Sequence, residues 1–158
     1  MNETSTETGT DRGIDRGTRG PTDRPTVIQY AGDDYFIATT PSGHAQTMDV
    51  QSGRRTAAGP LELFITGLGG CTAADVISIL HKKREKVTGY RVEIRTQRRD
   101  DHPRSFVRIE LKHIVRGTQI STESVRHAIE LSTHKYCSAI GTVRPTAEVV
   151  TSFEIVEE

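Results

Sequence analysis

The strongest structural signal in the chain is the segment LELFITGLGGCTAADVISILHKKREK, residues 61–86. The segment is apolar on nearly every helical face as far as Leu80 and then becomes abruptly charged from His81 onward. A helix that is apolar all round is a buried helix, and cations at its end suit the negative pole of the helix dipole. Gly59 and Pro60 precede it, and proline is accepted in a first helical turn. We therefore expect a long helix that runs through the core and reaches the surface near residue 81.

Strand signals lie on both sides of this helix. Upstream, two short strands surround the turn at 32–34, a hairpin signal, and a third strand follows. Downstream, apolar and polar residues alternate in two segments, as in half-buried strands. The predicted strands are residues 26–31, 35–40, 45–50, 90–98, 106–115 and 147–155.

Two further helices are predicted between the last two strands. Ser121 is a suitable N-cap for an amphipathic helix that places Val125, Ile129 and Leu131 inside. A short helical piece at 135–142 contains Cys137. The element order β-β-β-α-β-β-α-(α)-β predicts an α+β fold with largely antiparallel sheets around the long helix. A chain of this size struggles to cover that helix on all sides, so we expect a dimer in which the helix packs near its twin.

Length and composition predict one folded domain. The chain has 158 residues, which suits a single domain. Residues 1–25 hold almost no apolar side chains and cannot bury enough surface to offset the entropy of ordering, so they are expected to form a disordered tail. The folded domain is expected to cover residues 26–158.

Charge and hydropathy exclude several classes of function. Lys+Arg and Asp+Glu both total 21, so the formal net charge is zero, which argues against a nucleic-acid partner or an anionic membrane surface. No run of about 18 apolar residues is visible, so no membrane-spanning helix is expected. The N-terminus has no apolar core of a secretory signal. A cytoplasmic protein is the default expectation.

The chain holds two cysteines, Cys71 and Cys137. A small secreted scaffold would carry more of them at closer spacing. In a reducing cytosol the two are either buried small apolar residues or a redox pair, and composition alone leaves both readings open.

Cys71 lies in the middle of the long helix, next to three glycines, Gly67, Gly69 and Gly70. Each interior glycine costs about 1 kcal/mol relative to alanine, so close approach of another helix, a strand or a substrate is expected; helix packing alone is an equal alternative. Asp75 follows one turn after Cys71. A carboxylate in a buried stretch needs a partner; a cation there would also favour the thiolate, whereas a purely structural pairing is the alternative.

Cys137 lies at the start of the short helix, two residues after Lys135. A helix N-terminus and a nearby cation both lower the pKa of a thiol. A disulfide between the two cysteines needs their Cα atoms within about 7 Å, and sequence does not show whether Cys137 approaches Cys71.

Five stretches share one resemblance: GPLELF at 59–64, LGGCTAADV at 68–76, KKR at 82–84, AIELS at 128–132 and KYCS at 135–138. With these stretches the chain resembles the OsmC/Ohr superfamily, over about residues 26–158. The Gly-Gly-Cys and Lys-Tyr-Cys-Ser versions are closest to its OsmC-like branch. The resemblance implies an intertwined homodimer, with mostly antiparallel sheets wrapped around a long buried central helix and two active sites at the interface.

The resemblance also implies a thiol-dependent peroxidase that reduces organic hydroperoxides in oxidative and osmotic stress. Cys71 would be the peroxidatic cysteine and Cys137 the resolving one, joined in a disulfide after the Cys71 sulfenic acid forms. A small dithiol, of dihydrolipoyl type in characterised members, would reduce that disulfide. No metal and no tightly bound cofactor is implied.

The chain departs from the family pattern at two positions. Peroxidases of the family carry a glutamate ten residues before the first cysteine; Leu61 occupies that position here and Glu62 follows it. They also carry an arginine in the N-terminal hairpin, which has none here between residues 27 and 49; Arg54 or Arg55 is the candidate substitute. These departures motivate the alternative of a non-catalytic or redox-sensing member that binds a small apolar or electrophilic ligand at the dimer interface.

Overall fold

The computed structural model describes residues 24–51 and 53–158, so the predicted tail lies almost wholly outside the described residues. Contacts divide the chain into two compact units, described here as residues 24–48 and 49–158. The predicted order of elements is confirmed. The elements are β1 (Val27–Gly32), β2 (Tyr35–Thr39), β3 (Ala45–Asp49), α1 (Pro60–Lys82), β4 (Lys86–Arg98), β5 (Phe106–Thr118), α2 (Thr122–Leu131), the π-helical turn η1 (Ser132–Tyr136), α3 (Ser138–Val143) and β6 (Glu148–Glu157).

The first unit is built on the hairpin of β1 and β2, in a sheet of order β1-β2-β3. The hairpin is antiparallel and turns at Asp33 and Asp34, whose φ angles are 48° and 59°. A two-residue hairpin loop of type I′ needs positive φ at both positions, and aspartate tolerates it better than most residues. Several apolar side chains of this hairpin remain exposed, among them Val27, Ile28 and Tyr30.

The second unit contains a sheet of order β4-β5-β6. Strands β4 and β5 are antiparallel, as expected of two strands joined by a short turn. Strand β6 pairs with β5 in parallel, from Arg108↔Glu148 to Gly117↔Glu157. Parallel neighbours need a long crossover, which α2, η1 and α3 provide. One parallel pair is compatible with the expected largely antiparallel sheets, although the sequence did not indicate which pair it is.

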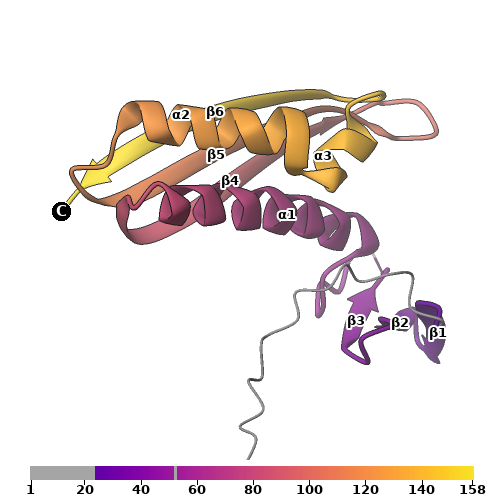
Figure 1. Ribbon diagram of the computed structural model, residues 1–158. Coiled ribbons are helices and arrows are strands. Elements are labelled where there is room, and N and C mark those ends of the chain that lie inside the picture. The colour runs from indigo at the N-terminus through magenta and orange to yellow at the C-terminus, as the bar shows by residue number, and fades with distance from the viewer. Residues whose placement is uncertain (1–23, 52) are drawn as a thin grey trace, which may run out of the picture. The chain divides into compact units, whose positions relative to one another are not determined.

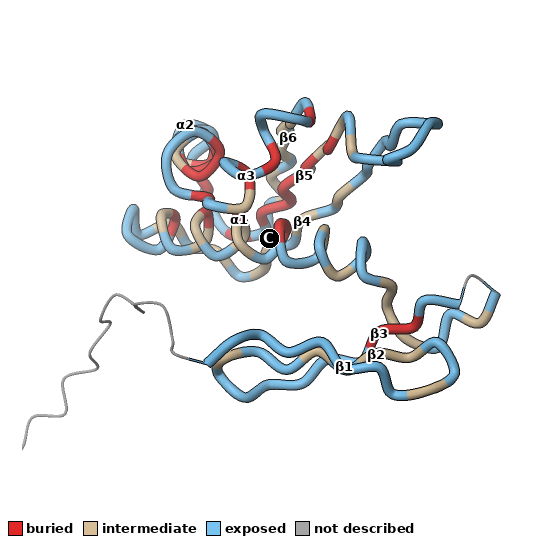
Figure 2. The backbone as a smooth tube through the Cα atoms, turned by 90° about the vertical axis from the view of Figure 1, so that its right-hand side faces the viewer, coloured by how far each residue is buried: buried red, intermediate tan, exposed pale blue. Residues whose placement is uncertain are grey.

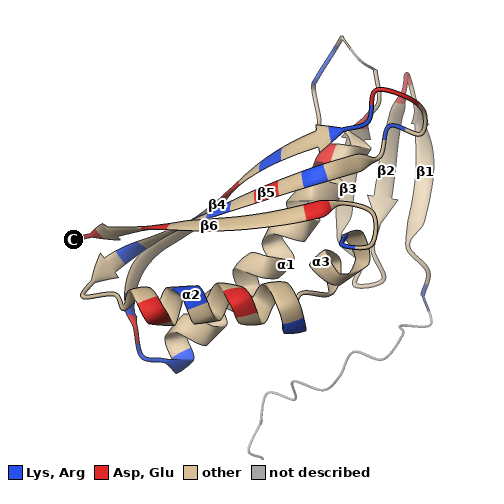
Figure 3. Ribbon diagram, turned by 90° about the horizontal axis from the view of Figure 1, so that it is seen from above, with Lys and Arg blue, Asp and Glu red and all other residues tan. Residues whose placement is uncertain are grey.

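The helices α1, α2 and α3 all lie on one face of this sheet (Figure 1). The β5 residues that face them are buried, including Ile109, Leu111 and Val115. The opposite face carries alternating charges along the strands (Figure 3), among them Arg108 and Glu110, paired at 2.7 Å. The predicted alternation of β5 is thus confirmed over most of its length.

Strand β5 departs from that alternation at its start. Gln97 pairs with Arg108 but Arg98 pairs with Phe106, so Val107 is an extra residue in a β-bulge. The bulge turns Phe106 toward the helices, where its ring stacks on Phe64 with centroids 5.9 Å apart. Phe106 was expected on the face of Arg108, and a bulge of this kind leaves no mark on the alternation pattern.

Helix α1 buries a single stripe of side chains in the single chain, and Figure 2 shows the rest of it exposed or half-buried. At Gly69 an added Cβ would lie 2.4 Å from Ile94 Cδ1, so this glycine permits the close approach of β4. The space around Gly67 and Gly70 is open. The expectation of a buried helix thus holds for one face of the single chain. The buried residues are Leu68, Gly69, Thr72, Val76 and Leu80.

Among the described residues, α1 is the one helix whose length and composition would suffice to cross a membrane, with a mean hydropathy of 1.7. The expectation that no segment meets these criteria was wrong. Core helices of soluble proteins meet the same criteria, and the buried stripe of α1 packs on the protein's own strands and helices.

Candidate active site

The structure brings Cys71 and Cys137 together. Cys71 lies at the middle of α1 and is half-buried, whereas Cys137 is the N-cap of α3 and is buried. Both belong to one apolar cluster of the second unit, and their thiols lie close enough to interact directly. Both cysteines are free thiols. The apolar walls of this cluster include Leu68, Ile109, Leu111, Ile140 and Val143.

Burial decides the acidity of Cys137. The pKa of this thiol is raised to about 11, mainly by desolvation and in part by the neighbouring Cys71. The backbone N–H of Ile140, which donates to Cys137 Sγ at 3.4 Å, acts in the opposite direction. The expectation that the helix terminus and Lys135 would lower this pKa was therefore wrong. The Lys135 ammonium lies over the Tyr136 ring, 5.4 Å from its centroid.

Asp75 is held by a chain of hydroxyl groups that joins α1 to η1. Ser132 Oγ donates to Asp75 Oδ2 at 3.1 Å, and Thr72 Oγ1 lies 2.9 Å from Ser132 Oγ. Because the single proton of Ser132 goes to the carboxylate, Thr72 is the donor to Ser132. Both hydroxyl residues are fully buried. The partner of Asp75 seen here is thus a hydroxyl, in keeping with the structural alternative, and the chain ties the segment before Cys137 to the helix of Cys71.

Glu62 serves as a helix cap. Its Oε2 accepts a hydrogen bond of 2.7 Å from the backbone N–H of Gly59, in a capping-box arrangement at the start of α1. Because α1 already begins at Pro60, Glu62 and Cys71 are separated by nine helical residues, or about 900° of rotation. Glu62 therefore points away from Cys71 of its own chain.

Arg54 is bound to Asp49 by two hydrogen bonds, Nε to Oδ2 and Nη2 to Oδ1, each of 3.0 Å. Asp49 is buried, and it also accepts hydrogen bonds from Thr56 and from the backbone of Gln51. The pKa of the Asp49 carboxyl is held well below its usual range, mainly by the hydrogen bonds from Arg54 and in part by those from Thr56 and Gln51. Arg55 has a positive φ of 52° in the same loop.

Asp49 and Arg55 line a pocket together with Pro60 and Glu62, at the N-terminus of α1. Arg54 and Arg55, the candidate substitutes for the family's hairpin arginine, therefore both lie in the loop before α1. Asp49 was not singled out in the sequence, although an acid two residues before a loop with two arginines is a signal for such an ion pair.

Sequence reasoning also missed the roles of Thr72 and Ser132. A signal existed for Ser132, which belongs to the AIELS stretch, but the π-helical turn that aims its hydroxyl at Asp75 follows from tertiary packing. Single π-turns inside helices occur often at functional sites. Within residues 24–51 and 53–158, no group of three or more His, Cys, Asp or Glu residues could hold a metal ion.

The α+β fold and the paired thiols on α1 and α3 define the class: a two-cysteine protein with one half-buried and one buried thiol. The family model described as OsmC-like protein matches residues 52–152. The chain therefore belongs to the OsmC-like family, which confirms the resemblance seen in its sequence.

Three relatives show how far this similarity extends. Protein YhfA of Escherichia coli strain K12 is 37% identical over 121 residues, 77% of this chain and 90% of that protein. A hypothetical protein from Aquifex aeolicus, known from a crystal structure, is 28% identical with a TM-score of 0.76, covering 85% of this chain and 96% of that one. The organic hydroperoxide resistance protein OhrB of Bacillus subtilis shares the fold, with a TM-score of 0.58 and 14% identity over 83% of this chain and 98% of its own.

Proposed function

We propose that this protein is a cytoplasmic, thiol-dependent peroxidase that reduces organic hydroperoxides with Cys71 and Cys137. The observation that carries the proposal is the contact between the two thiols inside one apolar cluster. Membership of a family that includes organic hydroperoxide resistance proteins supports it. The free thiols suit a reducing compartment.

The unequal burial of the two cysteines supports a division of roles. Cys71 is the more accessible and is the group that a hydroperoxide can reach. Its thiolate attacks the terminal oxygen of the hydroperoxide, the O–O bond breaks, and the alkoxide takes a proton and leaves as the alcohol. Cys71 is then a sulfenic acid.

Cys137 completes the cycle as the resolving cysteine. Its sulfur attacks the Cys71 sulfenic acid, a disulfide forms and water leaves. A thiol with a pKa of about 11 is protonated at neutral pH, which leaves the peroxide to Cys71. A small dithiol then reduces the disulfide by thiol–disulfide exchange and is itself oxidised to a disulfide. The apolar walls of the cluster favour an alkyl hydroperoxide over a hydrophilic one.

A homodimer is part of the proposal. Leu61 and Phe64 of α1 are each 45% exposed in the single chain, and the open space at Gly67 and Gly70 would let another helix approach closely. The hairpin of β1 and β2 exposes apolar side chains as well. Exposed apolar surface of this kind marks an interface. Sedimentation analysis of the wild type should show a dimer and that of Phe64→Asp a monomer; a monomeric wild type would contradict this part.

The activity test is reductant-coupled consumption of an alkyl hydroperoxide such as cumene hydroperoxide, with a small dithiol as electron donor. The wild type should turn over, Cys71→Ser should be inert, and Cys137→Ser should give at most one turnover. Mass analysis after one equivalent of peroxide should show an intramolecular Cys71–Cys137 disulfide in the wild type. It should show a sulfenic acid, trapped by dimedone, in Cys137→Ser.

A wild type that neither consumes hydroperoxide nor forms the disulfide would overturn the proposal. Arg126→Gln on α2 is a matched control, because Arg126 pairs with Glu123 on that helix. It belongs neither to the apolar cluster of the two thiols nor to the loop that carries Arg54 and Arg55. Its activity should equal that of the wild type.

A second function is favoured by the positions of Arg54 and Glu62. Arg54 is bound by Asp49 and Glu62 caps α1, so the candidate substitute for the family's arginine and the candidate catalytic glutamate both have structural roles within the chain. A redox-sensing or ligand-binding member does not need catalytic turnover. Stoichiometric disulfide formation without turnover, for any dithiol tested, would favour this function over the peroxidase.

A further inference from the structure

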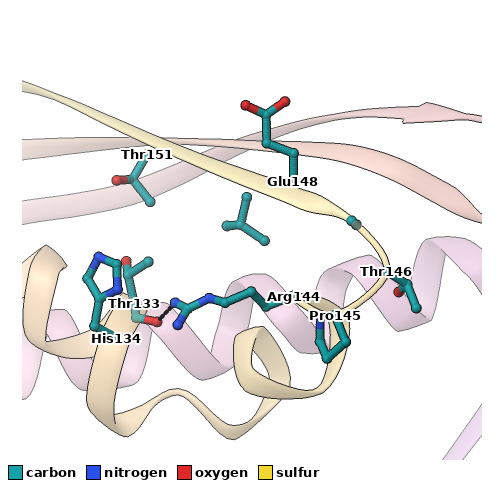
Figure 4. A pocket seen from close by; sticks show the side chains of 9 residues that line it. Thr133, His134, Arg144, Pro145, Thr146, Glu148 and Thr151 are labelled. Atoms are coloured by element: carbon teal, nitrogen blue, oxygen red, sulfur yellow. Dashed lines mark hydrogen bonds between the residues drawn. The ribbon is translucent and has the colours of Figure 1, made fainter.

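A pocket of about 480 Å³ opens between η1, the connection from α3 to β6 and the first half of β6 (Figure 4). Its volume lies in the range of small-molecule sites. It contains neither cysteine and none of Glu62, Asp75, Arg54 or Arg55. Ligand binding in this pocket does not require the proposed peroxidase function.

Arg144 provides the positive charge of this pocket. It follows α3, and its Nη2 donates a hydrogen bond to the backbone carbonyl of Thr133, which holds the side chain along one wall (Figure 4). A guanidinium has five N–H donors in a planar fork, and this hydrogen bond occupies one of them. The remaining donors suit two oxygens of one carboxylate or phosphate group.

Thr133 supplies a second polar group with no partner of its own. The residue is only 8% exposed, and its Oγ1 is buried without a hydrogen bond to any of the described residues. Figure 4 shows the Thr133 side chain between those of His134 and Arg144. A buried hydroxyl without a partner is destabilising. A ligand oxygen that accepts a hydrogen bond from Thr133 Oγ1 would satisfy this hydroxyl and could bind the Arg144 guanidinium at the same time.

Acidic groups do not oppose an anion in this pocket. Glu148 is the one acid among its lining residues, and Figure 4 shows its carboxylate pointing away from Arg144. That carboxylate is paired with Arg108 Nη1 at 2.5 Å on the outer face of the sheet. The imidazole of His134 and the hydroxyl of Thr151 complete a lining of donors.

We propose that this pocket binds the oxyanion group of a small molecule, a carboxylate or a phosphate, between the Arg144 guanidinium and the Thr133 hydroxyl. The two residues flank Cys137 in sequence, and Ala147 and Val149 of the pocket wall pack in the cluster of Cys137. A bound oxyanion therefore joins the segments on either side of that cysteine.

The test is a titration of the ¹⁵N-labelled full-length protein with sodium acetate and, separately, with sodium phosphate, at constant ionic strength set with sodium chloride. The proposal expects saturable shifts of the Thr133 amide and the Arg144 side-chain N–H signals with at least one of the two anions. Saturation by acetate alone identifies a carboxylate ligand, and saturation by phosphate alone a phosphate ligand.

Two variants separate the site from general charge effects. Arg144→Gln should weaken binding about tenfold or more, since it removes a charged bidentate donor. Thr133→Val keeps the shape of the side chain but removes the hydroxyl, and it should weaken binding about threefold or more. Arg126→Gln on α2 is the matched control and should bind as the wild type does.

Three results would overturn the proposal: shifts that follow chloride equally, wild-type binding by Arg144→Gln, or wild-type binding by Thr133→Val. If Arg144→Gln fails to fold, because its link to the Thr133 carbonyl is lost, Thr133→Val decides the question. Thermal denaturation of each variant beforehand establishes which of them are folded.

Discussion

The Cys137 thiol at the N-cap of α3 lies beside the Cys71 thiol on α1, and burial together with this neighbour raises the pKa of Cys137 to about 11. The two sulfurs are 66 positions apart in sequence (137 − 71), and the packing of α3 on α1 brings them together. The pair is therefore asymmetric, with a half-buried thiol facing a buried, protonated one.

The raised pKa of Cys137 predicts a loss of stability at alkaline pH. The unfolded chain releases this proton near pH 9.0 and the folded chain only near pH 11. The unfolded state thus binds fewer protons in this window, so the free energy of unfolding should fall as pH rises from 9 toward 11, and the contribution is fully present below pH 9. Urea denaturation at a series of pH values measures the slope. Cys137→Ala should lower that slope by about one proton, and an equal slope in this variant would contradict the prediction.

The buried pair of His113 and Tyr90 predicts a matching effect in acid. Tyr90 Oη lies 2.6 Å from His113 Nδ1, and His113 Nε2 has no partner among the described residues. Desolvation lowers the pKa of His113 from 6.5 to about 4. The unfolded state binds the proton first, so stability should be complete above pH 6.5 and fall as pH drops from 6.5 toward 4.

His113→Asn tests this prediction because it keeps a partner for Tyr90 but cannot titrate. Between pH 6.5 and 4, the slope of its free energy of unfolding against pH should correspond to about one proton less than that of the wild type. His127→Asn on the exposed face of α2 is the control and should retain the wild-type slope. A wild-type acid slope in His113→Asn would assign the effect to other groups.

The hydroxyl chain from Thr72 through Ser132 to Asp75 predicts strong coupling between its members. Ser132→Ala leaves the buried Thr72 hydroxyl without its acceptor and should cost about 1–3 kcal/mol of stability. Thr72→Val/Ser132→Ala removes both hydroxyls, so the double variant should lose less than the two single losses added together. Denaturant unfolding of the four proteins measures the coupling, and additive losses would show that the two hydroxyls act independently.

Gly117 predicts a steric effect where the end of β5 pairs with the start of β4. A Cβ at this position would lie 2.1 Å from the backbone oxygen of Lys86, which cannot move aside as a flexible side chain can. Gly117→Ala should therefore cost about 1–3 kcal/mol or more. Gly141→Ala is the matched control: the space around Gly141 in α3 is open, so helix propensity should stabilise this variant by up to about 1 kcal/mol. Thermal denaturation compares the two, and equal stabilities would refute the steric argument.

The order of the elements and the long helix followed from sequence because they depend on local patterns. The apolar run ending at Leu80 and the N-cap Ser121 each act within a few residues, and Ser121 Oγ indeed accepts from the Ser124 backbone at 3.2 Å. The bulge at Val107 and the parallel pairing of β6 did not follow, because both depend on which strand lies alongside.

The candidate site shows the same division. The chemical types of Cys71 and Cys137 and their placement on two helical segments were readable from the sequence alone. The pKa of Cys137 was misjudged, because the local influences of a helix terminus and Lys135 are weaker than desolvation by residues distant in sequence. For Asp75 the sequence left a cation and a structural partner open, and the π-helical turn supplies a structural partner, the Ser132 hydroxyl.

By itself the amino-acid sequence determined the family, the helix of Cys71 and the two thiols, since periodicity, capping and motif residues act over short stretches of chain. Tertiary structure alone decided that the thiols meet, that the later one keeps its proton, and that Arg144 and Thr133 line a common pocket. These properties depend on solvent exclusion and on contacts between distant segments, which local patterns do not encode.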